Sequence, residues 1–301
     1  MTRTWLNDLP VVTSPGAKDR LIAWEERCKV SHAGHFIGYR PPEAIPFTPS
    51  TRERSSLRVA IASSGGVHTR EHVPFDMENR AGDDSVRWVP ADVEPADLRF
   101  TDDHYDHTEA DADPECMFPL TRLHELVDDG YIGSVASQHL GFMGFVPDPT
   151  RFVNEVMPGV VDVLARDGVE AVVFGPGCPM CHRTVALAQR VVEAEGIPTV
   201  SVTLSPPLTI AIGVPRALHV RFPFGNTFGE KGDHWTQRAI LKAAIDWIGA
   251  APGPGAIVRL PYSWTSRAVP EDQDDCTDGA CFVPRRTGGA TSPADAEEPA
   301  P

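Results

Sequence analysis

The sequence is poor in basic residues and has no long hydrophobic run. Its 301 residues include 27 Lys and Arg against 42 Asp and Glu, a net charge of −15 at pH 7. Nucleic-acid phosphates are bound by clustered Lys and Arg, and the absence of such clusters argues against a nucleic-acid partner. No apolar stretch approaches the roughly 20 residues of a membrane helix, and the start, MTRTWLNDLP, lacks the apolar core of a signal peptide. We therefore expect a cytoplasmic protein without membrane contact, whose partner is a small molecule or another protein.

Cysteine is also scarce, with six in the chain. Cytoplasmic thiols are normally reduced, so these residues indicate reactive or metal-binding thiols better than a disulfide framework. Cys28, His32 and His35 match no common metal-site spacing. A GxGxxG fingerprint and internal repeats are absent too. Gly65 and Gly66 end an apolar run, where backbone N–H groups can meet a ligand, but no helix with the fingerprint's glycine spacing follows, so nucleotide binding is a weak interpretation.

What is present is an alternation of apolar strands and amphipathic helices. The segment LRVAIASSGG predicts a buried strand, and apolar residues at helical spacing predict two helices before the next buried strand. The expected elements are a strand at 57–66, helices at 120–127 and 152–167, a strand at 169–177, a helix at 181–196 and a strand at 197–204. A βαβ order implies parallel strands joined by a right-handed crossover. The predicted fold is α/β, with a mainly parallel sheet in Rossmann- or flavodoxin-like layers and disordered termini.

Composition divides the chain into three parts. Residues 1–55, which contain the Pro-rich stretch RPPEAIPFTPS, are expected to be an N-terminal extension and linker. Residues 56–252 are expected to form the catalytic α/β region, as one domain or two subdomains. Residues 253–301 are rich in Pro, Gly, Ser, Asp and Ala, which predicts a disordered acidic tail.

The most informative motif is GPGCPMCH, which begins at Gly175. Cys178 lies between a predicted strand and a helix start, where N–H groups and the helix dipole favour a thiolate and are expected to lower the thiol pKa. Gly177 removes a side chain that would block approach to the backbone. Cys181, one helical turn on, is placed to resolve an oxidised Cys178, and His182 adds a titratable neighbour. Three interpretations stay open: thiol redox or nucleophilic chemistry, a metal or iron–sulfur site, and a structural pair.

A second polar group lies in an acidic segment. His104, Tyr105, Asp106 and His107 follow one another and predict metal binding or acid–base chemistry, although an acidic loop contains such residues by chance. If the CxxC pair held a metal, His104 or His107 would be the further ligand. His68, in the loop after the first strand, is either a site residue or a solvated loop histidine.

These motifs carry a family resemblance. From about residue 57 to 250, some two-thirds of the chain, the sequence resembles the selenoprotein B family of the glycine, sarcosine and betaine reductases and the related D-proline reductase. The matching stretches, in the same order, are SSGGVH, HYD, FPLTRLHELVDDGYIGS, DGVEAVVFGPGCPMCHRTV and FPFGNT. The segment around the CxxC pair is the most specific of them.

The resemblance implies roles for individual residues. The selenocysteine of the family falls on Cys178 as nucleophile, and its partner cysteine falls on Cys181. The HYD motif falls on His104, Tyr105 and Asp106, which would orient substrate or transfer protons. The glycine turn of the family falls on Gly65 and Gly66. With these two, we expect His68, Gly177, His182 and Asn226 to bind substrate. A cysteine in place of selenocysteine is a less acidic nucleophile and a poorer leaving group.

The activity implied is that of a thiol-dependent reductase subunit. Its thiolate would attack the α-carbon of an amino-acid-like substrate, with reductive cleavage of a C–N or C–X bond. The chain has no Thr-Cys dipeptide that could form a pyruvoyl group, so that cofactor would reside on a partner subunit. Cys276 and Cys281, in DDCTDGACF, form a candidate redox pair in the tail, fed by a thiol donor. The alternative is a metal- or iron–sulfur-binding protein, or a non-catalytic scaffold of a multi-subunit complex.

Overall fold

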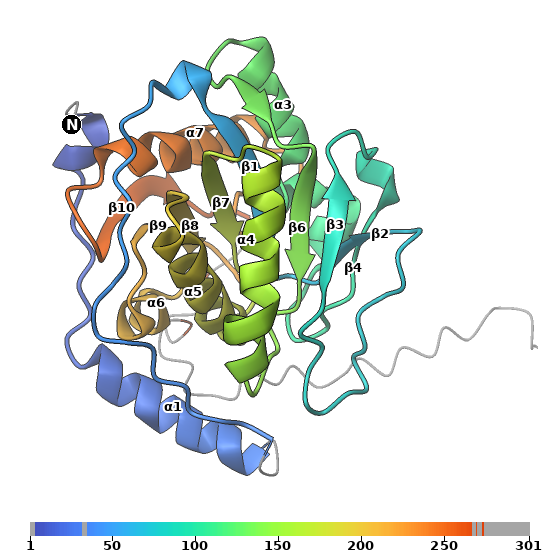
Figure 1. Cartoon of the computed structure of the whole chain (residues 1–301), viewed down its shortest axis with the longest axis vertical. Helices are drawn as coiled ribbons and strands as arrows, with labels where there is room; N and C mark the ends of the chain where they lie inside the picture. Colours follow the sequence, from blue (N-terminus) through green and yellow to red (C-terminus); the bar gives the residue numbers. More distant parts are fainter. Residues whose placement is uncertain (1–3, 32–34, 267–268, 270–272, 274–301) are drawn as a thin grey trace, which may run out of the picture.

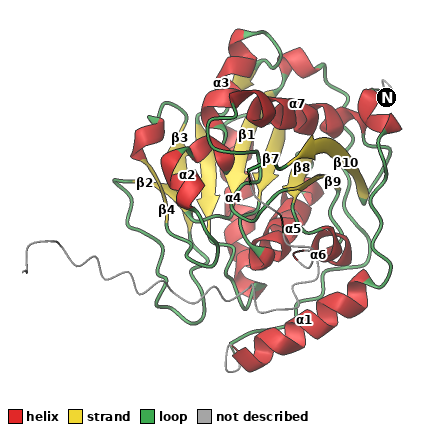
Figure 2. Ribbon diagram, turned by 180° about the vertical axis from the view of Figure 1, so that it is seen from behind, coloured by secondary structure: helices red, strands yellow, loops and turns green. Residues whose placement is uncertain are grey.

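The chain forms a mainly parallel sheet with helices on both faces (Figures 1 and 2). The computed structural model describes residues 4–31, 35–266, 269 and 273. The strands are β1 (Arg58–Ser63), β2 (Val67–Thr69), β3 (Val86–Pro90), β4 (Leu98–Phe100), β5 (Ser134–Val135), β6 (Gln138–Phe142), β7 (Ala171–Gly175), β8 (Thr199–Thr203), β9 (Arg216–Arg221) and β10 (Ala256–Ser263). The helices are α1 (Ala17–Ser31), α2 (Thr108–Ala112), α3 (Leu120–Asp128), α4 (Met157–Arg166), α5 (Pro179–Ala194), α6 (Pro206–Ile212) and α7 (His234–Ala250).

The strand order is β10-β9-β8-β7-β1-β6-β3, with β5 beside β1. All neighbours in this sheet are parallel except β3, which runs antiparallel to β6 at the edge. Strands β2 and β4 form a separate antiparallel pair. The α/β prediction with a mainly parallel sheet is therefore confirmed.

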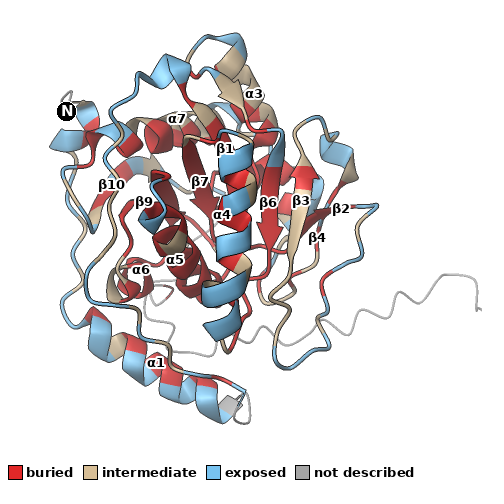
Figure 3. Ribbon diagram, in the orientation of Figure 1, coloured by how far each residue is buried: buried red, intermediate tan, exposed pale blue. Residues whose placement is uncertain are grey.

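The central strands are buried on both faces (Figure 3). Val59 and Ile61 of β1 belong to one buried cluster, on the side of α3 and α7, while Ala60 and Ala62 belong to a second, on the side of α4 and α5. Neighbouring residues of a strand point to opposite faces, and parallel sheets covered by helices are apolar on both. This explains why the strands read as continuous apolar runs in the sequence. Within the described ranges, no helix has the length and apolar character needed to cross a bilayer.

The N-terminal residues belong to the core, which corrects their assignment as an extension. Leu6, Leu21 and Trp24 are buried and lie in the same cluster as the sheet residues, and α1 packs on α6 (Figure 1). The helix has weak amphipathic patterning, with apolar residues interspersed among charged ones. Its burial therefore comes from tertiary contacts that local pattern does not report.

The boundary placed at residue 253 is also corrected. Residues Ala256–Ser263 form β10, which pairs in parallel with β9 and extends the sheet. The Pro- and Gly-rich stretch before it is the connection from α7, and Ile257, Val258 and Leu260 are buried. The rest of the predicted tail, from residue 274, lies outside the described residues.

A buried ion pair fastens the N-terminal segment to the sheet. Arg216 at the start of β9 and Glu193 in α5 are both fully buried and bonded to each other. Glu193 accepts from the backbone N–H groups of Thr48 and Thr199, and Arg216 donates to the carbonyl oxygens of Thr48 and Ile248. The pair thus satisfies backbone groups of three segments.

We predict that Arg216→Met destabilises the protein by about 3–5 kcal/mol, because it leaves Glu193 as an unpaired buried charge. Urea unfolding monitored by circular dichroism measures this. Arg52→Met is the matched control, since Arg52 pairs with Glu170 but is 65% exposed, and its loss is expected to cost less than about 1 kcal/mol. Equal costs for the two variants would contradict the assignment.

Candidate active site

The CxxC pair lies at the carboxyl edge of the sheet. Strands β9, β8, β7 and β1 are consecutive and parallel, so the segments that follow them meet at one edge, where α/β proteins commonly bind ligands. Cys178 comes three residues after β7 and is the N-cap of α5. Pro179 follows as the first helical residue, a position suited to its fixed φ and missing N–H. The predicted strand-to-helix placement of the thiols is confirmed.

The two thiols are in contact and buried. Their Sγ atoms lie 2.9 Å apart, and both residues are free cysteines. Cys178 Sγ accepts the backbone N–H of Cys181 at 3.2 Å, which is the N-cap interaction expected at a helix start. Cys181 Sγ lies 3.3 Å from the carbonyl oxygen of Ser64. The pair can therefore alternate between a dithiol and a disulfide without moving the helix, because residues one turn apart meet the Cα separation that a disulfide requires.

A buried carboxylate contacts the second thiol. Asp102 is fully buried, and its Oδ2 lies 3.5 Å from Cys181 Sγ. Its Oδ1 lies 2.7 Å from Nδ1 of His104 and accepts the backbone N–H of the same residue. The His104 ring stacks on Phe145 with centroids 4.6 Å apart. The segment from Asp102 to His104 thus presents a carboxylate to the thiol pair and a partly exposed imidazole behind it.

The pKa of the Cys178 thiol is raised well above its ordinary value. Burial is the largest cause, followed by the hydrogen bond and charge of Cys181 and the charge of Asp102, while the N–H of Cys181 lowers it. The expectation that the helix start would lower this pKa is therefore corrected. The helix N–H group is present, but desolvation of a fully covered thiolate outweighs it.

His182 supports the backbone of Cys178. Its Nδ1 lies 2.6 Å from the carbonyl oxygen of Cys178, and its Nε2 accepts the N–H groups of Leu204 and Ser205. Nδ1 therefore carries the proton and donates it. Burial lowers the pKa of His182 to about 3, so the ring is neutral. Both ring nitrogens are used in joining the start of α5 to the end of β8, a positioning role.

Two glycines allow the backbone to approach the site. A Cβ on Gly144 would overlap Cys181 Sγ. Gly66 has φ +70°, and a Cβ there would lie 2.8 Å from the backbone nitrogen of Asp102. Asp102 thus packs against the glycine turn after β1, and Cys181 packs against the segment HLGFMGF, residues 139–145.

Tyr105 covers the turn that carries Cys178. Its hydroxyl donates to the carbonyl oxygen of Gly65 at 2.9 Å, and its ring lies where a Cβ on Gly177 would be. Burial raises the pKa of Tyr105, with the charges of Asp102 and the thiols adding to it. Its neighbour Asp106 is exposed and accepts from the N–H and hydroxyl of Thr108. The structure therefore brings Asp102, and not Asp106, to the thiols.

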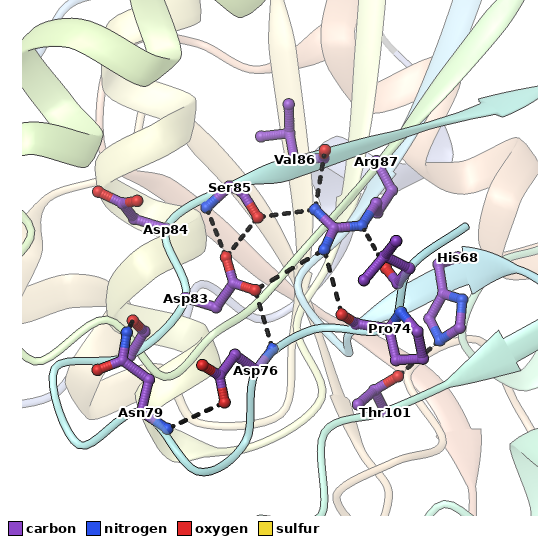
Figure 4. Close-up of polar contacts among 12 residues, drawn as sticks. His68, Pro74, Asp76, Asn79, Asp83, Asp84, Ser85, Val86, Arg87 and Thr101 are labelled. Carbon is purple, nitrogen blue, oxygen red and sulfur yellow. Dashed lines mark hydrogen bonds and ion pairs between the residues drawn. The ribbon is translucent and has the colours of Figure 1, made fainter.

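His68 contacts Thr101, the residue before Asp102 (Figure 4). Its Nδ1 donates to the carbonyl oxygen of Thr69, and its Nε2 lies 2.6 Å from the hydroxyl of Thr101. Thr101 directly precedes Asp102. Beside it, Arg87 holds the loop between β2 and β3 by donating to the carbonyl oxygens of Val73 and Pro74. His68 is thus in place to position the segment that carries the carboxylate.

Three polar side chains at this edge are buried without a partner among the described residues. They are Ser64 after β1, Ser205 after β8 and Asn226 after β9, and for Asn226 both amide atoms are unpaired. Buried polar groups are nearly always hydrogen-bonded. The Asn226 loop contacts the CxxC turn, because the N–H of Gly225 donates to the carbonyl oxygen of Gly177. Asn226, implied by the resemblance, is therefore joined by two serines that sequence motifs did not single out.

The described residues contain one group of potential metal ligands that includes both thiols. Asp102, Cys178 and Cys181 offer atoms within 4.8 Å of one another, and a second group joins Asp102, Asp103 and His104. His107, a predicted further ligand, is in neither. Of Cys28, His32 and His35, which match no common metal-site spacing, Cys28 is buried in the core and His32 lies outside the described residues, as do Cys276 and Cys281.

Asp102 is the main residue that the sequence did not predict. It lies two positions before the HYD motif among many acids, and local spacing does not distinguish the one carboxylate that folds inward. Its only sequence signal is its place two residues after β4, Leu98–Phe100.

We predict that uncovering the turn makes Cys178 more reactive. Tyr105→Ala should raise the rate of Cys178 alkylation by iodoacetamide at pH 8 at least about tenfold, because each unit by which the thiol pKa falls gives tenfold more thiolate. Peptide mass spectrometry of timed samples measures it. Tyr105→Phe is the control, since it keeps the ring and loses only the hydroxyl. A rate for Tyr105→Ala equal to that of the control would contradict the covering role.

Comparison with known proteins identifies the family. D-proline reductase subunit gamma of Acetoanaerobium sticklandii is 33% identical over 232 residues, which cover 77% of this chain and 94% of that protein. Sarcosine reductase complex component B subunit beta of Peptoclostridium acidaminophilum is 27% identical over 217 residues, and betaine reductase complex component B subunit beta of the same organism is 24% identical over 209. This chain spans about half the length of those two relatives. No family model and no solved structure matches it. The resemblance carried by the motifs is thereby confirmed, and the chain belongs to the component B family of the D-proline, glycine, sarcosine and betaine reductases.

Proposed function

We propose that this chain is the subunit of an amino-acid reductase complex that carries the nucleophile. Cys178 attacks a carbon of the substrate, and Cys181 resolves the product. The observation that carries the proposal is the contact of two free, buried thiols, 2.9 Å apart, at the start of α5. The relatives, which are named as components of amino-acid reductases, support the reaction class.

The reaction balances with the two thiols as reductant. The Cys178 thiolate forms an S–C bond at the α-carbon, and the C–N bond breaks with the electron pair and a proton going to the amine. Cys181 then attacks Cys178 sulfur, the S–C bond breaks, and the carbon takes up a proton. The substrate carbon gains two electrons and the thiols become a disulfide. An external thiol donor must reduce that disulfide before the next turnover.

We propose a small amino-acid-like substrate. Ser64, Ser205 and Asn226 supply unpaired polar groups at the same edge as the thiols, suited to a carboxylate and an amine. D-Proline, named for one relative, is the first compound to test. A pyruvoyl group on a partner subunit would supply a carbonyl that activates the substrate amine, while this chain supplies the thiols and the polar groups around them.

Catalysis requires the site to open. Cys178 is 1% exposed, and the segments over it are the turn with Tyr105 and the loop with Gly225, whose N–H bonds the Gly177 carbonyl. Closure desolvates the thiol and holds its pKa high. Opening, or docking of the partner subunit, would restore the influence of the helix start and generate the thiolate.

We predict that Cys178→Ser abolishes turnover and that Cys181→Ser traps a covalent adduct on Cys178. Each protein is incubated with D-proline, glycine, sarcosine or betaine and a lysate that supplies the partner subunits. Turnover is followed by product formation, and the mass of the Cys178 peptide is measured by mass spectrometry to detect the adduct. Cys116→Ser is the control, because Cys116 is equally buried but has no part in the proposed mechanism. Full turnover by Cys178→Ser would overturn the mechanism.

We further propose that the tail thiols pass electrons to the disulfide. Gln273 is buried, and its side chain donates to the carbonyl oxygen of Phe222 at 2.7 Å, at the end of β9. The ring of Phe224 lies 5.6 Å from that of His182, which bonds the Cys178 carbonyl. Cys276 is three residues beyond Gln273, a reach of at most about 10 Å. This anchoring supports a role for Cys276 and Cys281 close to the site.

We predict that changing both Cys276 and Cys281 to Ser slows reduction of the Cys178–Cys181 disulfide by a thioredoxin-type protein at least about tenfold, because a buried disulfide is reached poorly by a large donor. Reduction by dithiothreitol should change little. Acid quenching and mass spectrometry measure both rates, with Cys28→Ser as the control. Unchanged reduction by the protein donor would end the relay proposal.

Metal binding is the second candidate, favoured by the convergence of Asp102, Cys178 and Cys181. Metal analysis of anaerobically purified protein separates the two functions. Stoichiometric zinc or iron that is lost in Cys178→Ser favours the metal site, whereas metal-free protein that forms the disulfide reversibly favours the reductase.

A further inference from the structure

We propose that Asp102 is the base that takes the proton from Cys181 when this thiol attacks Cys178. The inference rests on the proposed function, since it concerns the step in which the bond between Cys178 and its adduct is broken. It assigns a catalytic role to a residue outside the predicted set and makes the two thiols chemically distinct.

The geometry distinguishes the thiols. Cys178 Sγ accepts the N–H of Cys181, an interaction that stabilises negative charge on Cys178. Cys181 Sγ instead faces two acceptors, the carbonyl oxygen of Ser64 at 3.3 Å and Oδ2 of Asp102 at 3.5 Å. Of these only the carboxylate can take up a proton. A thiol attacking a neighbouring sulfur must lose its proton, and a base within hydrogen-bond reach supplies the acceptor.

Burial makes such a base necessary. Cys181 is fully buried, so water is not in contact with its sulfur to accept the proton. Two thiolates side by side would also repel each other, and burial disfavours a charged sulfur. Transfer to Asp102 during the attack avoids a free Cys181 thiolate, because the proton moves as the S–S bond forms.

His104 is a positioning residue for this base. Its Nδ1 and its backbone N–H both lie on Oδ1 of Asp102, which leaves Oδ2 toward the thiol. Phe145 stacks on the ring and fixes its plane. The His104 side chain is 19% exposed while Asp102 is 0% exposed, so His104 is the point at which the pair meets solvent.

The test follows the resolving step with a probe that needs no substrate. Full-length protein with Cys276 and Cys281 changed to Ser is mixed with dithiodipyridine, which converts Cys178 into a mixed disulfide and releases one thiopyridone. Attack by Cys181 on Cys178 then releases the second and leaves the internal disulfide. Acid quenching and mass spectrometry give the fractions of dithiol, mixed disulfide and internal disulfide over time.

We expect Asp102→Asn to accumulate the mixed disulfide, because its resolution is slowed at least about tenfold. A positioned general base typically contributes a factor of about 10² to 10⁴, so tenfold is the minimum expected. The first step should be unchanged or faster, because the negative charge of Asp102 raises the pKa of Cys178. Resolution in this variant should recover as pH rises, because hydroxide can then take the proton in place of Asp102. The titratable groups around Asp102 are Cys178, Cys181, Asp103, His104 and Tyr105.

Matched variants separate chemistry from structure. Asp129→Asn makes the same change on a side chain that is 57% exposed and pairs with Arg238 away from the thiols, and it should resolve like the parent. His104→Asn keeps an N–H donor for Asp102 and should resolve nearly normally, whereas His104→Ala should accumulate the mixed disulfide. Misfolding of Asp102→Asn would uncover every thiol, so that the buried Cys28 and Cys116 would also react with the reagent, whereas in the folded variant Cys178 reacts before them.

The possible failures are distinct. If Cys181→Ser accumulates the mixed disulfide but Asp102→Asn does not, the role of Asp102 is overturned and the thiol pair stands. If Cys178→Ser reacts as the parent does, the proposed function itself is overturned.

Discussion

The position of Cys178 as the N-cap of α5 is the constraint on which the rest of the site depends. It places the sulfur on the N–H of Cys181 and the second sulfur beside the first. His182, four residues along the helix, returns to bond the carbonyl oxygen of Cys178 and ties it to β8. Cys181 packs so closely on Gly144 that position 144 has no room for a Cβ atom. One helix turn, held at both its backbone and its sulfurs, thus sets the geometry of the thiol pair.

Two opposing electrostatic influences act on that turn. The helix start favours a thiolate on Cys178, while burial and the neighbouring carboxylate of Asp102 oppose it. In the closed arrangement burial dominates, and Cys178 rests as a neutral thiol. A sulfur that is unreactive while covered fits the function proposed above, in which substrate or a partner subunit would open the site before the thiolate forms. Activation by opening matters for a cysteine at this position, because a thiolate is harder to generate than a selenolate.

Much of this site follows from local sequence, and the rest follows from contacts that local sequence does not encode. The strand-to-helix setting of Cys178 could be predicted because apolar runs, glycines and helical spacing are local signals. Asp102 could not, because its importance comes from a turn that folds one of many acids onto Cys181. Strand β10 was missed since Pro and Gly around it resemble a linker, and pairing with β9 overrides that composition. The direction of the Cys178 pKa was also missed, because helix dipoles are visible in a sequence and burial is not.

The central claim is that Cys178 and Cys181 form one reversible two-electron couple. The most direct measurement is equilibration of the protein in dithiothreitol redox buffers, followed by acid trapping and mass spectrometry of the peptides that contain the two residues. The account predicts a single transition between the dithiol and a Cys178–Cys181 disulfide, with a slope that corresponds to two electrons. Persistence of both thiols under every oxidising buffer, or disulfides that join either residue to Cys28 or Cys116 instead, would contradict it.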